Sequence, residues 1–260
     1  MPTEQDVTVL KQLNKAFALH IPHGRTIAME AVEAGLGDRK ADAVWIKENF
    51  SHLVETVQIQ AYEGYLQHEK QAWKQAFATV FGPQLRNCES PERIAEVIGE
   101  HFYALDKFFL SRTQSRRSRA GGAFELLLHE LFARLNYPFT FQPRIDGKPD
   151  FVFPSVEYYL ENPPDAIVFT AKRSLRERWR QIVTEGARGL GFYLATIDEA
   201  VSESAITEMK ISRIQLVVPD RHKSEITRYV GGHNVISFED FFMDHLDPKM
   251  TKWNRNGVVK

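Results

Sequence analysis

Polar residues with catalytic potential stand at the ends of two apolar segments in the second half of the chain. Asp150 opens the segment DFVF, and Lys172 directly follows the segment AIVFTA. Two strands joined through a loop can lie side by side, which would bring these polar ends together. A carboxylate is a hard oxygen ligand that suits Mg²⁺, and the cation would lower the pKa of a water molecule and neutralise charge on a phosphate. The lysine would orient or deprotonate that water and stabilise the transition state. The pair therefore indicates metal-assisted hydrolysis of a phosphodiester.

Each of these residues alone also fits an ordinary structural role. An aspartate after a proline is common in turns, and a lysine after a buried strand is usually a solvated strand end. A single carboxylate would also be a poor metal site, so a second acid must come from elsewhere. Glu185 follows Lys172 by thirteen residues on a predicted helix, and Glu125 lies on the predicted helix before the strands. Glu125 fits an exposed helix position equally well, and its nearest competitor, Glu130, is expected at the surface.

The arrangement resembles that of the PD-(D/E)xK nucleases, the fold group of many type II restriction endonucleases. Their usual pattern places an acid two residues before the lysine, where this chain has Thr170. The spacing of Asp150, Lys172 and Glu185 is instead similar to that of the EcoRII/PspGI/SsoII group, whose second acid lies on the following helix. The segments SRRSRAGGAFE and KRSLRERWRQIVTE also look like segments of that group, and the resemblance covers about residues 112–220.

The resemblance implies a fold, an activity and a set of site residues. The fold class is α/β (α+β), a restriction-endonuclease-like core with a mixed β-sheet flanked by helices and preceded by a helical N-terminal region. The implied activity is Mg²⁺-dependent cleavage of double-stranded DNA that leaves 5′-phosphates. The implied catalytic residues are Asp150, Lys172, Glu185 and Glu125, with Asp150 and Glu185 as the metal ligands.

The triplet Arg176-Glu177-Arg178 begins four residues after Lys172 and suits base recognition. Guanine presents O6 and N7 acceptors in the major groove, which suit a bidentate arginine, and cytosine presents an amino donor that suits a glutamate. In the group that the chain resembles, this triplet reads a CC/GG half-site, and a palindrome of two half-sites implies a homodimer. The expected sites are CCWGG first, then CCNGG, then a site that contains CCGG.

Basic residues concentrate in two segments of a nearly neutral chain. The chain has 33 basic and 34 acidic residues, yet Ser111–Gly122 has four arginines and no acid, and Lys172–Arg180 has five basic residues and one acid. Such concentration indicates a localised anionic ligand. The alternative is that these arginines form ion pairs with acids from other segments. We expect contacts to the DNA backbone from the following residues: Arg116, Arg117, Arg119 and Arg173.

The elements that must position these residues divide the chain at about residue 110. Residues 1–110 read as helices, expected to contact DNA or form the dimer, and residues 111–260 as the nuclease core. The predicted helices of the first half are Val7–Ala18, Ala41–Val57, Ala61–Phe81 and a helix that Ser90 caps and that ends at Phe109, followed by an arginine-rich loop. The second half predicts, in order, helix 123–135, strands 139–143, 150–153 and 166–171, helix 175–188, strands 191–196 and 213–218, and closing helices 224–229 and 237–245, with a loop insertion at 157–164.

Composition excludes several classes of protein. The chain of 260 residues is 43% hydrophobic, 26% charged and 12% aromatic, which is typical of globular domains and not of disordered chains or coiled coils. Cys88 is the single cysteine, so no internal disulfide or cysteine-based zinc site is possible. No apolar run is long enough for a membrane span, and the N-terminus lacks a secretory signal pattern. A cytoplasmic protein with no membrane contact and no small-molecule cofactor is the expectation.

Two alternative functions remain open at this point. A structure-directed or repair nuclease would share the catalytic core but would need no palindrome, and an inactive DNA-binding protein would have no reason to keep all three catalytic residues. A further expectation concerns the centre of the site, since some members of the group extrude the central base pair and stack the freed bases on side chains. Trp73, Phe77 and Phe81 are candidates for that role, and the sequence does not choose among them.

Overall fold

The computed structural model describes residues 3–175 and 192–259, with the side chains of residues 117–122 left out of the description. The helices are α1 (Glu4–His20), α2 (Gly24–Leu36), the 3₁₀ turn η1 (Gly37–Arg39), α3 (Ala43–Glu48), α4 (Phe50–Leu85), α5 (Pro91–Glu100), α6 (Phe102–Arg134), α7 (Val156–Glu161), α9 (Glu203–Ile211), α10 (Asp220–Glu225), α11 (Thr227–Val230), α12 (Phe238–Asp240), the π-helix η3 (Phe241–Leu246) and α13 (Asp247–Arg255). The strands are β1 (Thr140–Phe141), β2 (Phe151–Phe153), β3 (Ile167–Ala171), β4 (Phe192–Ala195), β5 (Ile214–Val218) and β6 (Val235–Ser237).

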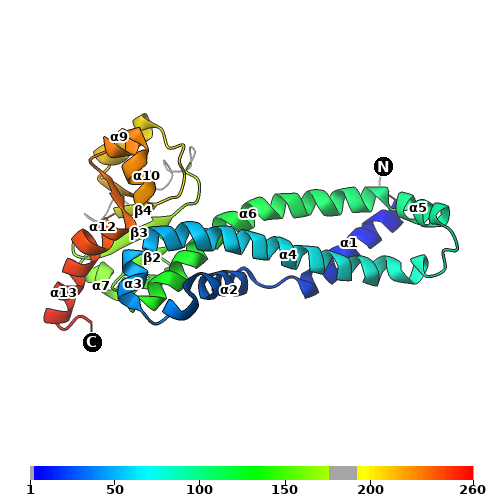
Figure 1. Ribbon diagram of the computed structural model, residues 1–260, viewed down its shortest axis with the longest axis horizontal. Coiled ribbons are helices and arrows are strands. Elements are labelled where there is room, and N and C mark those ends of the chain that lie inside the picture. The colour runs from blue at the N-terminus through cyan, green and yellow to red at the C-terminus, as the bar shows by residue number, and fades with distance from the viewer. Residues whose placement is uncertain (1–2, 176–191, 260) are drawn as a thin grey trace.

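Two long helices join an α/β body to a helical arm (Figure 1). α4 has 36 residues and α6 has 33, so at 1.5 Å per residue each is roughly 50 Å long. α1 packs against both helices toward the far end of the arm, where Phe17, Phe81 and Phe108 are buried in a common core. α2 packs against the same two helices near the body. Because α4 and α6 both continue into the body, the arm is continuous with the fold that carries the strands.

The body is built on a six-stranded mixed sheet with the strand order β1-β2-β3-β4-β5-β6. β1, β2 and β3 pair antiparallel, and β3 to β6 pair parallel. Every residue of β2, β3 and β4 is buried, which explains why these strands read as continuous apolar runs rather than alternating ones. One face packs against Phe132, Phe241 and Phe242, and the other against α9 residues such as Met209. The mixed sheet with flanking helices and a helical N-terminal region confirms the predicted fold class.

The arginine-rich segment is not the loop that the sequence predicted. Residues 111–122 are part of α6, which runs without interruption from Phe102 to Arg134. Arginine, alanine and glutamine are good helix formers, and packing at both ends of α6 outweighs the propensity cost of two adjacent glycines. The proposed boundary at residue 110 therefore falls inside a single helix, and the division of the chain into two domains stays a proposal.

Several other boundaries differ from prediction for local reasons. Two helices were predicted at Ala41–Val57 and Ala61–Phe81, but the break in the structure falls at Asn49, between α3 and α4. The Asn49 side chain donates to the Trp45 carbonyl oxygen at 2.8 Å, which ends α3 there. Ser90 caps α5 as expected, but α5 ends at Glu100 rather than at residue 109. The expected insertion at 157–164 contains α7, capped by Ser155. Helices α2 and α9 and strand β6 were not predicted, and the predicted helix 175–188 lies outside the described residues except for Leu175.

No helix in the described part of the chain is both long enough and apolar enough to cross a membrane.

Candidate active site

The antiparallel pairing of β2 with β3 brings Asp150 and Lys172 to one edge of the sheet. Phe151 at the start of β2 pairs with Phe169 near the end of β3, so the residue before β2 lies beside the residues that follow β3. Asp150 Oδ2 accepts the backbone N–H of Ala171 at 2.8 Å and lies 3.2 Å from Lys172 Nζ. The two polar strand ends therefore meet, as their positions in the sequence predicted.

α6 supplies a second carboxylate to the same lysine. Glu125 Oε1 lies 2.6 Å from Lys172 Nζ, and the Gln142 amide approaches Glu125 Oε2 at 3.5 Å. Thr170, the residue at the usual position of the second acid, is buried in β3 and carries no carboxylate. Glu125 thus brings a carboxylate to the cluster from a helix and not from a strand. Glu125, and not its competitor Glu130, therefore lies beside Lys172.

Glu130, one turn further along α6, is not the surface residue that the sequence predicted. It is buried and accepts Arg25 Nε at 3.3 Å, and His129 Nδ1 lies 3.1 Å from the same Oε1 atom. The five-residue separation from Glu125 turns Glu130 toward α2 and away from the lysine. The role of Glu130 is therefore to connect α6 with α2.

The cluster is electrostatically unusual because two carboxylates face one ammonium group. Burial raises the pKa of Asp150 to about 6, and the Glu125 carboxylate adds to that rise against the opposing effect of Lys172. Burial alone would lower the pKa of Lys172, but the Asp150 and Glu125 carboxylates together raise it above its ordinary value. Lys172 is therefore a stable cation in this arrangement, which suits it to charge stabilisation and not to proton abstraction.

The donor set of the cluster fits a divalent cation. Asp150 and Glu125 present hard oxygen atoms, and together they carry more negative charge than Lys172 neutralises. Within residues 3–175 and 192–259, however, no group of three or more His, Cys, Asp or Glu residues is arranged to hold a metal ion. The further acid that the sequence predicts, Glu185, lies outside the described residues. The same is true of the predicted base-reading residues Arg176, Glu177 and Arg178.

The arginines predicted to contact the DNA backbone have different surroundings. Arg116 Nε donates to Glu69 Oε2 at 2.6 Å, and Glu69, which is buried on α4, also accepts the Tyr65 hydroxyl at 3.0 Å. Arg173 is exposed at the carboxyl end of β3, one residue beyond Lys172. The side chains of Arg117 and Arg119 lie outside the description. An ion pair within the protein, the alternative interpretation of the arginine segment, is thus present at Arg116.

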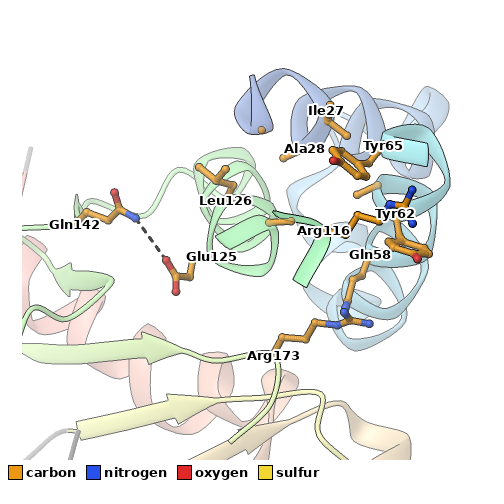
Figure 2. A pocket seen from close by; sticks show the side chains of 13 residues that line it. Ile27, Ala28, Gln58, Tyr62, Tyr65, Arg116, Glu125, Leu126, Gln142 and Arg173 are labelled. Carbon is orange, nitrogen blue, oxygen red and sulfur yellow. Dashed lines mark hydrogen bonds between the residues drawn. The ribbon is translucent and has the colours of Figure 1, made fainter. Parts of the chain in front are cut away.

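A pocket of about 350 Å³ adjoins the cluster. Its walls come from α2, α4 and α6, and Glu125 and Arg173 lie at the end that faces the strands (Figure 2). Tyr62 and Tyr65 line the α4 side, and Tyr62 is 47% exposed. Gln58, which is 8% exposed, lines the same side, and its Oε1 atom has no hydrogen-bond partner among the described residues. The pocket therefore combines aromatic faces with an unsatisfied hydrogen-bond acceptor.

The three aromatic residues that the sequence offered as candidates for base stacking do not line this pocket. Trp73, Phe77 and Phe81 stack on one another along α4, with ring centroids 5.2 Å and 4.7 Å apart, and they belong to the core beneath α1. Phe81 is fully buried there, and Trp73 and Phe77 are partly buried. Sequence reasoning missed Tyr62 because its exposure depends on how α2 and α6 pack. Its spacing of four from Gln58 on a helix, which places both on one face, was the available signal.

Comparisons with known proteins identify a family of restriction enzymes. The family model described as "EcoRII C terminal" matches residues 86–242. The type II restriction enzyme SsoII of Shigella sonnei is 34% identical over 169 residues, which are 59% of this chain and 52% of that protein. The type II restriction enzyme EcoRII of Escherichia coli is 35% identical over 135 residues, which are 48% of this chain and 33% of that protein. The matches thus span about half of SsoII and one third of EcoRII.

Solved structures share the fold over nearly the whole chain. Metal-depleted Ecl18kI in complex with uncleaved DNA has a TM-score of 0.79 and 25% sequence identity, covering 96% of this chain and 86% of that one. The PspGI–substrate DNA complex has a TM-score of 0.64 and 24% identity, covering 89% of this chain and 94% of that one. The helical arm is therefore included in the likeness to Ecl18kI and is part of a known architecture.

Proposed function

Because the chain belongs to the EcoRII C-terminal family, we propose that it is a type II restriction endonuclease that cleaves both strands of a short palindrome with CC/GG half-sites. One observation carries the proposal: Lys172 Nζ lies within 3.2 Å of both Asp150 and Glu125, at the edge where β2 and β3 meet. A partly buried cluster of two carboxylates and one ammonium group is costly to maintain, and such arrangements concentrate at catalytic sites.

The proposed chemistry is hydrolysis of a phosphodiester with Mg²⁺ as cofactor. Asp150 and Glu185 would hold the cation, which when bound lowers the pKa of water and neutralises charge on the phosphate. Glu125 lies 2.6 Å from Lys172 Nζ and would orient its ammonium group. Lys172 would place its positive charge beside the phosphate oxygens as their charge develops in the transition state. The products would carry 5′-phosphates.

Sequence recognition is assigned to the residues that follow the catalytic lysine. Arg176, Glu177 and Arg178 would read two adjacent G·C pairs, so the expected sites are CCWGG, then CCNGG, then a site that contains CCGG. The exposed Arg173 would contact the DNA backbone, as would Arg117 and Arg119. Arg116 already pairs with Glu69, so any phosphate contact would have to use its terminal guanidinium nitrogens.

The pocket beside Glu125 would receive an unpaired base from the centre of the site. Tyr62 offers an exposed aromatic face for stacking, and Gln58 offers an amide that can pair with the edge of a base. The volume of about 350 Å³ is in the range of small-ligand pockets, which accommodates a single base. If 2-aminopurine is placed at the central position, stacking on Tyr62 would quench its fluorescence. The complex with Tyr62→Ala should therefore fluoresce more strongly than the complex with the wild type, whereas Trp73→Phe should behave as the wild type.

Digestion of a fully sequenced plasmid with Mg²⁺ and with EDTA tests the proposed function. Discrete fragments that form only with Mg²⁺ and that carry CC…GG at every end would support it and identify the site. Nicking or a smear without a defined site would favour a structure-directed nuclease instead. Absence of cleavage together with a retarded band on CC…GG duplexes would favour an inactive DNA-binding protein.

A further inference from the structure

Residues 196–202 form the loop between β4 and α9, and this loop is hydrogen-bonded to the three residues that follow Lys172. β3 and β4 are parallel neighbours, so their carboxyl ends emerge at the same edge of the sheet. Lys172 still belongs to the ladder, since its N–H donates to the Ala195 carbonyl oxygen at 2.9 Å. The chain then leaves the sheet, and Arg173, Ser174 and Leu175 form hydrogen bonds to the loop.

Asp198 makes the central contacts of this connection. Its Oδ2 atom accepts the Leu175 backbone N–H at 2.9 Å and the Ser174 hydroxyl at 3.0 Å. The Thr196 hydroxyl adds a third bond by donating to the Arg173 carbonyl oxygen at 3.3 Å. Hydrogen bonds to a carboxylate are roughly twice as strong as those between neutral groups. Three consecutive residues after the catalytic lysine are thus fixed to one loop.

The loop is itself anchored on the body. The Ala200 N–H donates to Asp198 Oδ1 at 2.9 Å, which leaves both carboxylate oxygens engaged. The Tyr229 hydroxyl donates to the Asp198 carbonyl oxygen, and Arg228 Nε donates to the Val201 carbonyl oxygen at 2.6 Å. Leu175 is buried in the core on this side of the sheet. The carboxylate of Asp198 therefore connects the chain after Lys172 to a part of the fold that cannot shift easily.

We propose that Asp198 is a positioning residue for sequence discrimination. The inference rests on the proposed function, in which base reading begins at Arg176, the residue directly after Leu175. Side chains that form bidentate contacts to bases must be placed accurately, so the backbone directly before them must be fixed. Asp198 fixes this backbone through its hydrogen bonds with Ser174 and Leu175, whereas Lys172 is held by the sheet. Loss of Asp198 should therefore lower discrimination between sites more than it lowers the rate of cleavage at the correct site.

The test measures single-turnover cleavage by Asp198→Ala with saturating protein. The substrates are a duplex with the site at which the wild-type protein cuts and the same duplex with one outer C·G pair changed to T·A. We expect the rate constant at the correct site, divided by that at the altered site, to fall by about fivefold or more, which is the lower end of the cost of one bidentate base contact. Glu203→Ala, which removes an exposed charge on the adjacent α9, is the control and should keep the wild-type ratio.

Two further variants keep the inference testable if Asp198→Ala fails to fold. Asp198→Asn retains one acceptor oxygen and should recover part of the discrimination, and Ser174→Ala removes one of the donors and should lose part of it. In the background of Arg178→Ala, the loss caused by Asp198→Ala should shrink, because both changes act on the same contacts.

The possible outcomes separate this inference from the proposed function. If Asp198→Ala keeps the wild-type ratio of the two rate constants, even with both rate constants lowered equally, the positioning role is overturned and the proposed function stays intact. A wild-type protein that cuts both duplexes equally would overturn the proposed recognition of bases and the inference with it.

Discussion

The Lys172 ammonium group contacts two carboxylates that reach it from different elements. Asp150 comes from the start of β2 and Glu125 from α6, and both lie within 3.2 Å of the ammonium group. The raised pKa of Lys172 means that it remains charged at neutral pH in this cluster. Charge stabilisation is consequently the role that its surroundings favour over removal of a proton from water.

Replacement of this lysine should separate catalysis from binding. We expect Lys172→Ala to lower the rate of cleavage by at least about 10²–10³-fold, because a charge that stabilises the transition state is lost. Binding of duplex DNA, measured by gel retardation with Ca²⁺ in place of Mg²⁺, should be largely unchanged. Lys210→Ala on the exposed side of α9 provides a matched control that should cleave normally. Turnover retained by Lys172→Ala would exclude the assigned role.

The raised pKa of Asp150 predicts how cleavage depends on pH. A protonated carboxyl group cannot bind a cation, and burial raises the pKa of Asp150 to about 6. The single-turnover rate at limiting Mg²⁺ should therefore be high above pH 7 and should fall as the pH drops through about 6. Since cation and proton compete, more Mg²⁺ should move the fall to lower pH. A rate that is constant between about pH 7 and pH 5 at limiting Mg²⁺ would contradict this.

At the scale of elements, the long helix α6 links the arm to the cluster of Asp150, Glu125 and Lys172. Its residue Arg116 pairs with Glu69 of α4, and its residue Glu125 reaches Lys172. Both contacts depend on α6 being one helix through the arginine-rich segment, where a loop was predicted. A rigid connection over this length means that the packing of α4 against α6 also helps to place Glu125 at the sheet edge.

The ion pair between Arg116 and Glu69 offers a test at this scale. Arg116→Ala would leave the Glu69 carboxylate buried and without its cation, so the free energy of unfolding should fall by about 1–3 kcal/mol. Urea unfolding of Arg116→Ala measures this, and Arg86→Ala, near the end of α4, is a control that should change stability little. Unchanged stability together with a smaller dependence of DNA affinity on salt would instead identify Arg116 as a phosphate contact.

At the scale of the whole molecule, an arm of long helices projects from a body that carries the cluster at one sheet edge (Figure 1). The described residues place one cluster of Asp150, Glu125 and Lys172 in each chain. Cleavage of both strands of a palindrome at once needs two such clusters related by a two-fold axis. The proposed function therefore requires a second copy of the chain.

Sedimentation equilibrium should show this protein as a dimer in solution. With the palindromic duplex, two chains should bind one DNA molecule, because each half-site needs one base-reading segment. A duplex with a single half-site is the matched control and should bind one chain less tightly. A monomer at micromolar concentration that still cuts both strands in one binding event would refute the model of two half-sites.

Part of this picture was determined by the sequence alone. Asp150 and Lys172 could be paired because apolar runs of strand length end at each of them, and the strand pattern is local along the chain. The same local pattern predicted a mixed sheet with flanking helices and the Ser90 cap of α5. These features depend on spacing and propensity over a few residues, which a single sequence contains.

Other features were decided only by the tertiary structure. The burial of Glu130 against Arg25 of α2 depends on how α2 packs on α6, and the pairing of Arg116 with Glu69 joins residues 47 positions apart. The continuity of α6 through the arginine-rich segment follows from packing that outweighs local propensity. Likewise, the exposure of Tyr62 beside a pocket depends on three helices that meet there. Contacts between distant segments arise from how whole elements pack, and no local pattern in the sequence encodes that packing.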